Sequence, residues 1–362
     1  MKVGVISGGT RNMIEQSVYE FFKGKHILVT GGTGSFGHQI VRDLLPLDPA
    51  CVHIYSRDEK KQYDMAMSYQ QCRKLRFDIG DVRNLERTRD AMRGIDVVFN
   101  AAALKQVPNC EYAPFEAVET NIIGANNVRR AAIEAGVQAV VSISTDKAVK
   151  PVNVMGMTKA IQERIMLDPT YSDGNTRFVC VRYGNVLGSR GSVVPLFFNY
   201  IQRNLPLPIT NPAMTRFQLT LKEAVQLVFC ATVRGESGDL WVQKMPAARI
   251  PDLGQALAFG ITGQQDYPLT ITGMRPGEKM HEVLVSEEEM WRATELENHY
   301  LIPSWAKSQN KEPIEQSQVS EYASNCTHQL TQSEILNMLE ADGWFGPDAK
   351  AKAAHGIEIN ED

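Results

Sequence analysis

Short apolar runs and segments of helical spacing alternate along the first half of the chain. Residues 27–30 form an apolar run of strand length that meets a glycine-rich turn. The next segment places Ile40, Val41, Leu44 and Leu45 at helical spacing. Such alternation predicts the α/β class with a Rossmann-type doubly wound parallel sheet. Further strands are expected at 51–56, within 75–84, at 96–100, within 139–147 and at 177–184, and long helices at 114–135 and 155–168.

The composition changes after Gly188, where proline and turn residues become more frequent. This change predicts a smaller C-terminal substrate-binding domain, and helical spacing at 219–233 predicts a helix that returns to the first domain. The expected division is an N-terminal extension at 1–24 (a packing arm without chemistry), a Rossmann domain at 25–190 with a return segment at about 217–245, a substrate-binding domain at 191–216 and 246–346, and a disordered tail at 347–362.

The glycine-rich turn carries Gly31, Gly34 and Gly37 between a strand and a helix. In a dinucleotide site the first glycine permits a tight turn, the second admits a pyrophosphate, and the third lets helix and strand pack closely. The pyrophosphate would lie at the helix N-terminus, where free N–H groups favour an anion. We therefore expect a dinucleotide here, with contacts from Thr33, Ser35 and Phe36 as well.

The end of the second strand decides which dinucleotide is expected. An NAD-specific fold tends to place an acidic residue there, to bind the ribose 2′-hydroxyl. Here Ser56 and Arg57 come first, and a guanidinium pairs well with a 2′-phosphate, so NADP is favoured and NAD is the alternative. Asp58 and Glu59 are expected to cap the following helix instead.

Other cofactor contacts are expected where later strands end. Ligands of doubly wound folds bind at the carboxyl edge of the sheet, and small residues there let a flat ribose lie against the backbone. The expected contacts are Asp81 and Val82 at the adenine, Ala101, Ala103 and Lys105 after the fourth strand, and Asn121, Lys159 and Tyr183.

Composition narrows the classes of partner. Of the 362 residues, 43% are hydrophobic and 22% charged, as in ordinary soluble globular proteins. A net charge of −4 argues against general nucleic-acid or membrane-surface binding, which needs a basic excess. The start lacks the apolar region of a signal peptide, and the six cysteines lack metal-ligand spacing. We expect a cytoplasmic protein with no metal, no nucleic-acid partner and no membrane insertion.

The stretch 144–159 concentrates the candidate chemistry. Thr145, Asp146 and Lys147 are consecutive at a strand end, and Met155 and Lys159 share one face of the following helix because they are four residues apart. A hydroxyl, a carboxylate and two amines thus meet within one loop and one helical turn. A methionine side chain accepts no proton, so Met155 is expected to make only an apolar contact with the sugar or the nicotinamide.

The order of TGGTGSFG, GDVRN, NAAALKQVP, TDK, RYGNVLGS, MTRF and RPGEK resembles that of the extended short-chain dehydrogenases/reductases. The resemblance covers roughly residues 24–345. Within that superfamily the chain is similar to bacterial UDP-N-acetylglucosamine 4,6-dehydratases of polysaccharide pathways, and the Thr-Asp-Lys triplet is the most specific part. This resemblance implies a UDP-sugar substrate and a homo-oligomer, dimer or hexamer, built on the helices at 114–135 and 155–168.

Met155 departs from the YxxxK pattern of most of the superfamily. The MxxxK pattern resembles the subgroup that also inverts C5, so the resemblance implies an L-arabino 4-keto product for surface polysaccharide. The reaction needs a base for the C4 hydroxyl, a base for C5 and an acid for the departing O6 hydroxyl. Asp146 suits the acid if it is protonated, and Lys147 suits the C5 base if it is neutral. Thr145 can hydrogen-bond the C4 oxygen, and the C4 base is left open among Lys159, Lys105 and a water at Thr145.

The substrate is expected to meet polar groups from both domains. Two guanidiniums suit a diphosphate through charge-assisted bonds. Ser189, Arg190 and Ser192 form a further polar turn near the same opening. The expected substrate contacts are Lys105, Cys110, Met155, Asn185, Arg216 and Arg275. Three alternatives remain: a C5-retaining dehydratase, a nucleotide-sugar epimerase, and a non-catalytic NADP-binding protein.

Overall fold

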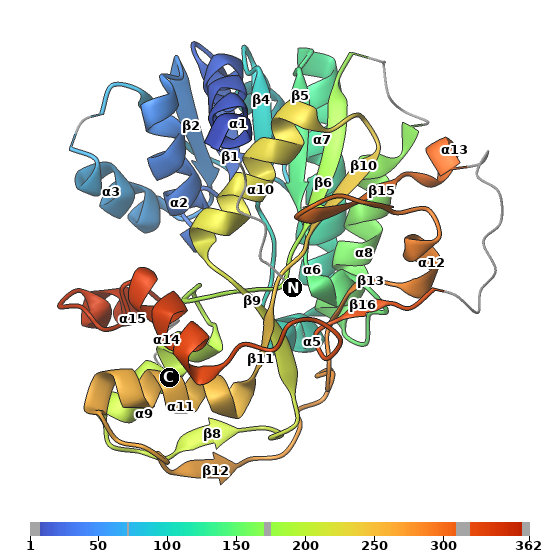
Figure 1. Cartoon of the computed structure of the whole chain (residues 1–362). Coiled ribbons are helices and arrows are strands. Elements are labelled where there is room, and N and C mark those ends of the chain that lie inside the picture. The colour runs from blue at the N-terminus through green and yellow to red at the C-terminus, as the bar shows by residue number, and fades with distance from the viewer. Residues whose placement is uncertain (1–7, 71, 170–174, 309–318, 357–362) are drawn as a thin grey trace.

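The computed structural model describes residues 8–70, 72–169, 175–308 and 319–356. Within these ranges, nine strands form a large sheet in the order β14-β15-β10-β6-β5-β4-β1-β2-β3 (Figure 1). The strands from β10 to β3 are parallel. The predicted α/β Rossmann class is confirmed. The bounds are β1 (His26–Thr30), β2 (Cys51–Ser56), β3 (Leu75–Ile79), β4 (Val97–Asn100), β5 (Ala139–Ile143), β6 (Arg177–Arg182), β10 (Asp239–Gln243), β14 (Thr294–Glu295) and β15 (His299–Pro303).

Helices cover both faces of this sheet, which explains the continuous apolar runs in its strands. Val97, Val98 and Phe99 of β4, for example, are fully buried. Helices α1, α2 and α10 pack on one face, and α4, α7 and α8 on the other (Figure 1). The bounds are α1 (Gly8–Phe22), α2 (Ser35–Leu44), α3 (Glu59–Ser68), α4 (Leu85–Met92), α7 (Gly124–Ala135), α8 (Val154–Leu167) and α10 (Leu221–Arg234).

The chain reverses its direction of travel across the sheet between β1 and β4. Strands β2 and β3 lie to one side of β1, while β4, β5 and β6 lie to the other. The connections at this point leave a crevice at the carboxyl ends of the strands, where ligands bind in doubly wound folds. The loops after β1, β2, β4, β5 and β6 all open toward it.

A second core lies below that edge of the sheet (Figure 1). Phe197, Leu207, Leu257 and Trp344 are fully buried in it. Two small sheets border this core: β7, β9 and β11 form one, and β8 and β12 form the other. The bounds are β7 (Asn185–Val186), β8 (Leu207–Ile209), α9 (Val193–Gln202), β9 (Thr215–Leu219), β11 (Ala247–Arg249), α11 (Ile250–Thr262), β12 (Leu269–Ile271), α14 (Gln332–Ala341) and α15 (Ala349–Gly356).

The stretch 246–346, expected in the second domain, does not lie wholly there. Strand β15 pairs antiparallel with β10, and β14 pairs with β15, so both extend the edge of the large sheet. Strand β13 pairs with β16 in a small separate sheet beside the 145–149 loop. The bounds are β13 (Val283–Val285), α12 (Glu287–Met290), α13 (Trp305–Ser308) and β16 (Tyr322–Ala323).

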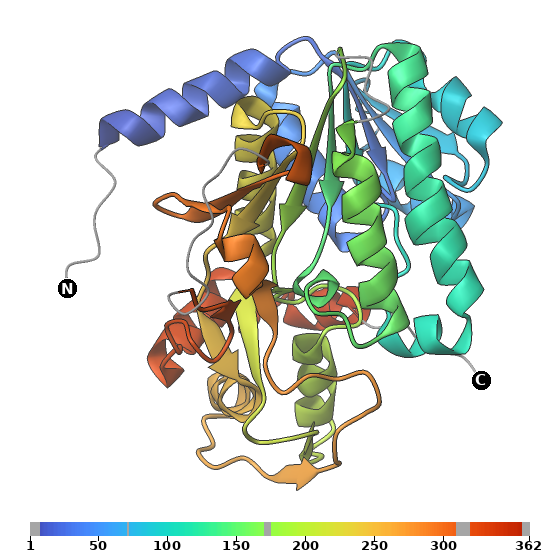
Figure 2. The same ribbon diagram turned by 90° about the vertical axis from the view of Figure 1, so that its right-hand side faces the viewer.

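Both ends of the chain carry packed helices. The extension forms α1, which lies against α10 at its C-terminal end and projects from the body at its other end (Figure 2). The expectation of a disordered tail is wrong for 349–356, because α15 buries Ala349 and Ala353 in the second core. Small apolar residues at a four-residue spacing carry that contact. Residues 1–7 and 357–362 lie outside the described ranges.

The helix expected at 114–135 contains a wider turn. It comprises α6 (Pro114–Ala117), a π-helical segment η2 (Val118–Ile123) and α7, and Gly136 ends it at φ 68°. Asn121 lies in the π-helical turn and is fully buried. Its side chain bonds both the N–H and the C=O of Leu104, at 2.8 and 2.9 Å. The irregular turn therefore anchors the loop after β4, as such turns often do near functional sites.

Replacing Phe22 by alanine tests whether α1 belongs to the folded core. Phe22 is fully buried, with ring centroids 6.0 Å from Phe99 and 5.0 Å from Phe229. Loss of a buried phenylalanine costs roughly 3–5 kcal/mol, so Phe22→Ala should lower the free energy of unfolding by about that amount in chemical denaturation. The exposed Glu20→Ala change is the control. A loss below about 1 kcal/mol would show that α1 is not a structural part of the domain.

Candidate active site

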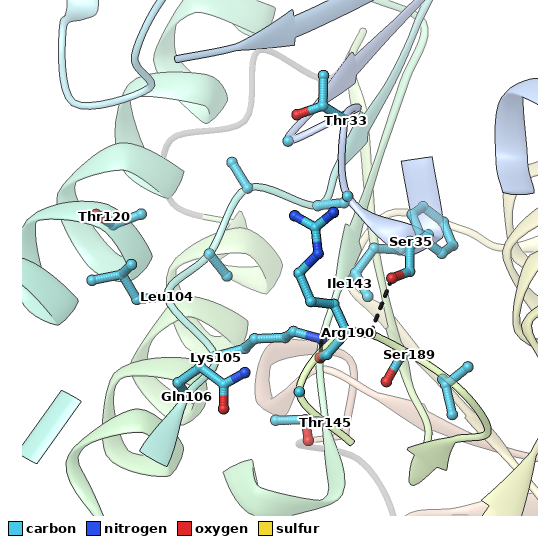
Figure 3. Close-up of a pocket in the computed structure, with 18 of the residues that line it drawn as sticks. Thr33, Ser35, Leu104, Lys105, Gln106, Thr120, Ile143, Thr145, Ser189 and Arg190 are labelled. Carbon is cyan, nitrogen blue, oxygen red and sulfur yellow. Dashed lines mark hydrogen bonds between the residues drawn. The ribbon is translucent and has the colours of Figure 1, made fainter. Parts of the chain in front are cut away.

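A cavity of about 570 Å³ lies at the carboxyl edge of the large sheet. Its walls come from the loops after β1, β2, β4, β5 and β6 and from α8 (Figure 3). The sequence-predicted residues that line it are Gly31, Thr33, Gly34, Ser35, Phe36, Ser56, Arg57, Asp81, Val82, Ala101, Ala103, Lys105, Thr145, Lys147, Met155, Lys159, Tyr183 and Asn185. Those outside the lining are Gly37, Cys110, Asn121, Asp146, Arg216 and Arg275.

The glycine-rich turn fits a dinucleotide. Gly31 has φ 64°, and a Cβ there would lie 2.9 Å from the Ala102 backbone. Gly34 is the N-cap of α2 and supplies no side chain to its first N–H groups, which leaves them available to an anion. A Cβ on Gly37 would lie 2.0 Å from the Gly32 carbonyl oxygen. Gly37 thus lies outside the cavity but allows the close approach of helix and turn that shapes it.

The two charged residues that follow β2, Arg57 and Asp58, make different contacts. Asp58 is the N-cap of α3, and its carboxylate accepts from the Lys61 N–H, as expected. Arg57 is half-exposed at the cavity, with Nη1 3.7 Å from Asp81 Oδ2. Asp81 is also held by Arg83, whose Nε donates to Oδ2 at 2.9 Å. Arg57 thus presents a guanidinium at the cavity edge, where Asp58 and Asp81 also line the wall.

The loop after β4 is tied across the cavity to the loop at 188–192. Lys105 Nζ donates to the Arg190 carbonyl oxygen at 2.8 Å, and the Arg190 N–H donates to Ser35 Oγ at 3.1 Å (Figure 3). Both positive side chains line the cavity. Sequence reasoning assigned Arg190 only to a polar turn, because nothing local indicates that this turn closes over the first glycine loop.

Thr145 and Lys147 face the cavity, whereas Asp146 lies behind them and is fully buried. Thr145 Oγ1 donates to Asp146 Oδ1 at 2.8 Å, and Lys147 Nζ donates to the same oxygen at 3.0 Å. The Oδ2 atom of Asp146 is buried and has no hydrogen-bond partner among the described residues. The carboxyl group therefore reaches the cavity through its two neighbours.

Lys147 suits the role of C5 base only in its neutral form, and its surroundings favour the charged form. Burial lowers the pKa of Lys147, but the carboxylates of Asp146 and Glu282 raise it by more, so its pKa lies above the usual value. Glu282 Oε1 is 3.5 Å from Lys147 Nζ. Glu282 lies more than 130 residues further along the chain, and no sequence pattern connected it to Lys147.

The pKa of Lys159 is shifted in the opposite direction, below its usual value. Its side chain is buried, and Nζ donates to the Ile143 carbonyl oxygen at 2.5 Å and to Gln162 Oε1 at 2.7 Å. Burial lowers the pKa of Lys159 to about 8, although Glu163 opposes the shift. A large fraction of this amine is therefore neutral near pH 8. Burial raises the pKa of Tyr183, a second titratable group that lines the cavity, above its usual range.

The expected substrate residues fall into three groups. Asn185 lines the cavity, with Oδ1 3.5 Å from Lys147 Nζ. Cys110 is buried beside Met155, and burial raises its pKa to about 11, so it is an inert thiol near neutral pH. Arg216 is buried and donates to the carbonyl oxygens of Thr215 and Lys279, while Arg275 is exposed outside the cavity.

Comparison with known proteins places the chain in a family. A family model described as polysaccharide biosynthesis protein matches residues 27–304. A relative from Rickettsia bellii (strain RML369-C), named UDP-glucose 4-epimerase, is 45% identical over 330 residues, which is 88% of this chain and 96% of the relative. The chain belongs to the polysaccharide biosynthesis protein family, among the extended short-chain dehydrogenases/reductases.

Two solved structures share the fold of this chain. Pen from Bacillus thuringiensis is 38% identical, with a TM-score of 0.82 over 89% of this chain and 99% of that one. DesIV from Streptomyces venezuelae, named dTDP-glucose 4,6-dehydratase and solved with NAD and TYD bound, is 21% identical, with a TM-score of 0.64 over 70% of this chain and 86% of that one. At this identity DesIV supports the fold alone. No helix among the described residues is long and apolar enough to cross a membrane.

A Gly37→Ala change tests the dinucleotide site of this family member. The added methyl group meets the Gly32 carbonyl oxygen and must push α2 away from the turn. Loss of one or two N–H bonds to a charged phosphate should weaken NADP binding about tenfold or more in calorimetry. Gly346→Ala, whose methyl group meets no atom within 4 Å, is the control. Unchanged NADP affinity in Gly37→Ala would contradict the assignment of this loop.

Proposed function

We propose that this chain is an NADP-dependent UDP-N-acetylglucosamine 4,6-dehydratase, a hydro-lyase with an internal redox cycle. The observation that carries the proposal is the ion pair between buried Asp146 and Lys147. Lys147, Thr145 and Lys159 line the cavity, and Asp146 lies directly behind Thr145 and Lys147. A 4,6-dehydration needs an acid and a base at C5–C6 in addition to the oxidation at C4. A 4-epimerisation needs only the oxidation and its reversal.

A bound dinucleotide would supply the hydride chemistry that the reaction needs at C4 and C6. The turn at Gly31 and Gly34 would hold its pyrophosphate, and Arg57 a 2′-phosphate, which is the basis for proposing NADP over NAD. The positive side chains of Lys105 and Arg190 at the cavity wall suit the diphosphate of the UDP-sugar. Arg216 and Arg275 stay proposed only for indirect roles, because neither lines the cavity.

Lys159 is the proposed base for the C4 hydroxyl. Of the three groups that the sequence left open, it is the one whose pKa, at about 8, makes the neutral amine abundant. A base works best when its pKa lies near the working pH. Lys105 instead donates to the Arg190 carbonyl, a role that suits binding.

Elimination is proposed to use the Asp146–Lys147 pair. Passage of a proton from Lys147 Nζ to Asp146 Oδ1 leaves a neutral amine at the cavity and a carboxylic acid behind it. The amine takes the C5 proton, while Thr145 passes the acid's proton to the departing O6 hydroxyl. The C5–H and C6–O bonds break, water leaves, and the ion pair is restored. Two protons leave the sugar, one from the C4 hydroxyl and one from C5, and two are delivered, one to the departing hydroxyl and one later to C5 of the product.

The product then needs a proton at C5. Its return to the opposite face of the ring gives the L-arabino 4-keto sugar that the MxxxK pattern implies, and its return to the same face gives the retained isomer. Either product suits surface polysaccharide biosynthesis, in keeping with the family description. A cytoplasmic location fits a UDP-sugar substrate.

A second candidate is a UDP-glucose 4-epimerase, because the Rickettsia bellii relative carries that name. Such an enzyme would use Lys159 at C4 and would have no use for the proton relay at Asp146. The two candidates therefore differ in what they demand of Asp146.

We also propose a homo-oligomer, dimer or hexamer. Ile123 of η2 and Met157 and Ile161 of α8 are apolar yet 46–47% exposed, as expected of a helix-helix contact between copies. Analytical ultracentrifugation of the pure protein measures the mass of the assembly, and a monomer at micromolar concentration would refute the proposal.

Incubation with UDP-N-acetylglucosamine tests the proposed reaction. NMR of the mixture should show loss of the C6 hydroxymethyl signals and a new C6 methyl group, with the C5 coupling pattern reporting the configuration. UDP-glucose and UDP-galactose serve as comparison substrates. A C4 epimer of either sugar without a methyl signal would establish the epimerase instead.

Asp146→Asn separates the two candidates further. The amide keeps the size of the side chain but cannot carry the relayed proton. Dehydration should fall by about 10²–10⁴, the usual contribution of general acid–base catalysis. C4 oxidation, seen as reduced-cofactor absorbance in a single turnover, should fall much less. Equal losses in both steps would assign Asp146 a structural role.

The pH dependence tests the role of Lys159. Because the folded enzyme holds its pKa near 8, below the ordinary value of 10.5, the active neutral form gains population as pH rises. The value of kcat/KM should therefore rise about tenfold per pH unit below pH 8 and level off above it. Lys159→Gln should abolish this rise with pH and should also remove most of the activity. A flat profile between pH 6 and 9 would remove Lys159 from the role.

Arg57→Ala tests the choice of NADP. Loss of a guanidinium–phosphate contact should raise the Kd for NADP by roughly 10- to 100-fold and leave the Kd for NAD within about threefold. Lys60→Ala, which removes an exposed partner of Asp64 outside the cavity, is the control. Equal effects on both dinucleotides would show that Arg57 does not read the 2′-phosphate.

A further inference from the structure

Glu282 is a second buried carboxylate beside Lys147 and has no role in the scheme above. It directly precedes β13 and is 2% exposed. Its backbone is fixed on both sides by Ser324, whose Oγ accepts from the Glu282 N–H at 3.0 Å and whose N–H donates to the Glu282 carbonyl oxygen at 2.8 Å. The carboxylate is thus placed by a rigid pair of strand ends.

Three cations surround this carboxylate. Its Oε1 atom is 3.5 Å from Lys147 Nζ and 3.8 Å from Arg216 Nε, and its Oε2 atom is 3.6 Å from Lys279 Nζ. Oε2 is buried and has no hydrogen-bond partner among the described residues. Burial raises the pKa of Glu282, but Lys147, Arg216 and Lys279 lower it by more, so the group is ionised.

Arg216 and Lys279 have their own anchors. Arg216 donates to the carbonyl oxygens of Thr215 and Lys279, at 2.7 and 2.9 Å, and Lys279 Nζ donates to the Val149 carbonyl oxygen at 2.6 Å. These two cations therefore stay in place without Glu282. Arg216 also disfavours a charge on Lys147, an effect that the two carboxylates of Asp146 and Glu282 must overcome.

We propose that Glu282 is a positioning residue of the elimination site: it holds the Lys147 ammonium between its own carboxylate and that of Asp146. Glu282 thereby keeps the shared proton of the Asp146–Lys147 pair on Lys147. The assignment of a catalytic use to this pair depends on the proposed function, whereas the placement of the charge does not.

The charge balance gives the reason. With Glu282, two carboxylates, of Asp146 and Glu282, face the three cations of Lys147, Arg216 and Lys279. Without it, Lys147 keeps a single buried carboxylate and the repulsion of its cationic neighbours. Loss of the Glu282 charge therefore lowers the pKa of Lys147, and it also lowers the pKa of Lys279, which burial already holds below its usual value.

NMR of the enzyme containing [ε-¹³C]lysine measures this directly and needs no substrate. Lys147→Arg identifies the Lys147 signal. In the unaltered enzyme that signal should stay in its charged position through pH 10. In Glu282→Gln, which keeps the shape and removes the charge, its titration should move down by about one pH unit or more. Glu282→Asp should restore most of the shift.

Activity shows what this placement does for the reaction. In Glu282→Gln, kcat should fall at least about tenfold, KM for the nucleotide sugar should stay within about twofold, and a descending alkaline limb should enter the measured range. Glu287→Gln is the matched control. It breaks a lysine–glutamate pair with Lys150 that is exposed, at 2.8 Å, and that has no contact with Lys147.

Each outcome has one meaning. A Lys147 titration that is unchanged in a folded Glu282→Gln protein, checked by its thermal midpoint, overturns the proposal. A moved titration with unchanged kcat overturns the catalytic part of it. A moved titration in a protein that converts no nucleotide sugar keeps the placement of Lys147 and refutes the proposed function instead.

Discussion

The close approach of backbone at the end of β1 is the constraint on which the site depends. Gly31 turns with φ 64° directly against the Ala102 backbone, at the point where the strand order reverses. No side chain fits between these loops, so the first turn of α2 opens onto the crevice with its N–H groups free for an anion. The loops after β4, β5 and β6 then converge on the same edge and bring Lys105, Thr145 and Asn185 to one cavity.

Two lysines that line this cavity have pKa values shifted in opposite directions. Lys159 is buried with mainly neutral hydrogen-bond partners, and its pKa falls to about 8. Lys147 is less buried, with 22% of its side chain exposed, and the carboxylates of Asp146 and Glu282 favour its charged form. One amine is thus suited to accept a proton and the other to hold one. Such a division matches a reaction that takes a proton from one oxygen and delivers one to another.

The sequence predicted the parallel sheet, the glycine turn and most of the cavity wall, because these follow from local patterns: strand-length apolar runs, glycine spacing and residues at strand ends. It did not predict the lowered pKa of Lys159 or the raised pKa of Lys147, since both depend on groups brought in from distant segments. For the same reason, the sequence did not predict that Arg216 lies in an internal cluster of charged groups outside the cavity. The tail at 349–356 was misjudged because its small residues signal a helix only weakly until a core is present to bury them.

The central claim is that C4 oxidation and C5–C6 elimination occur in one cavity. UDP-N-acetylglucosamine carrying deuterium at C4, incubated with the enzyme and NADP, tests it most directly. The deuterium should move from C4 to the C6 methyl group of a 4-keto product, with one solvent hydrogen at C5. Deuterium that returns to C4 of an epimerised or unchanged hexose would contradict it.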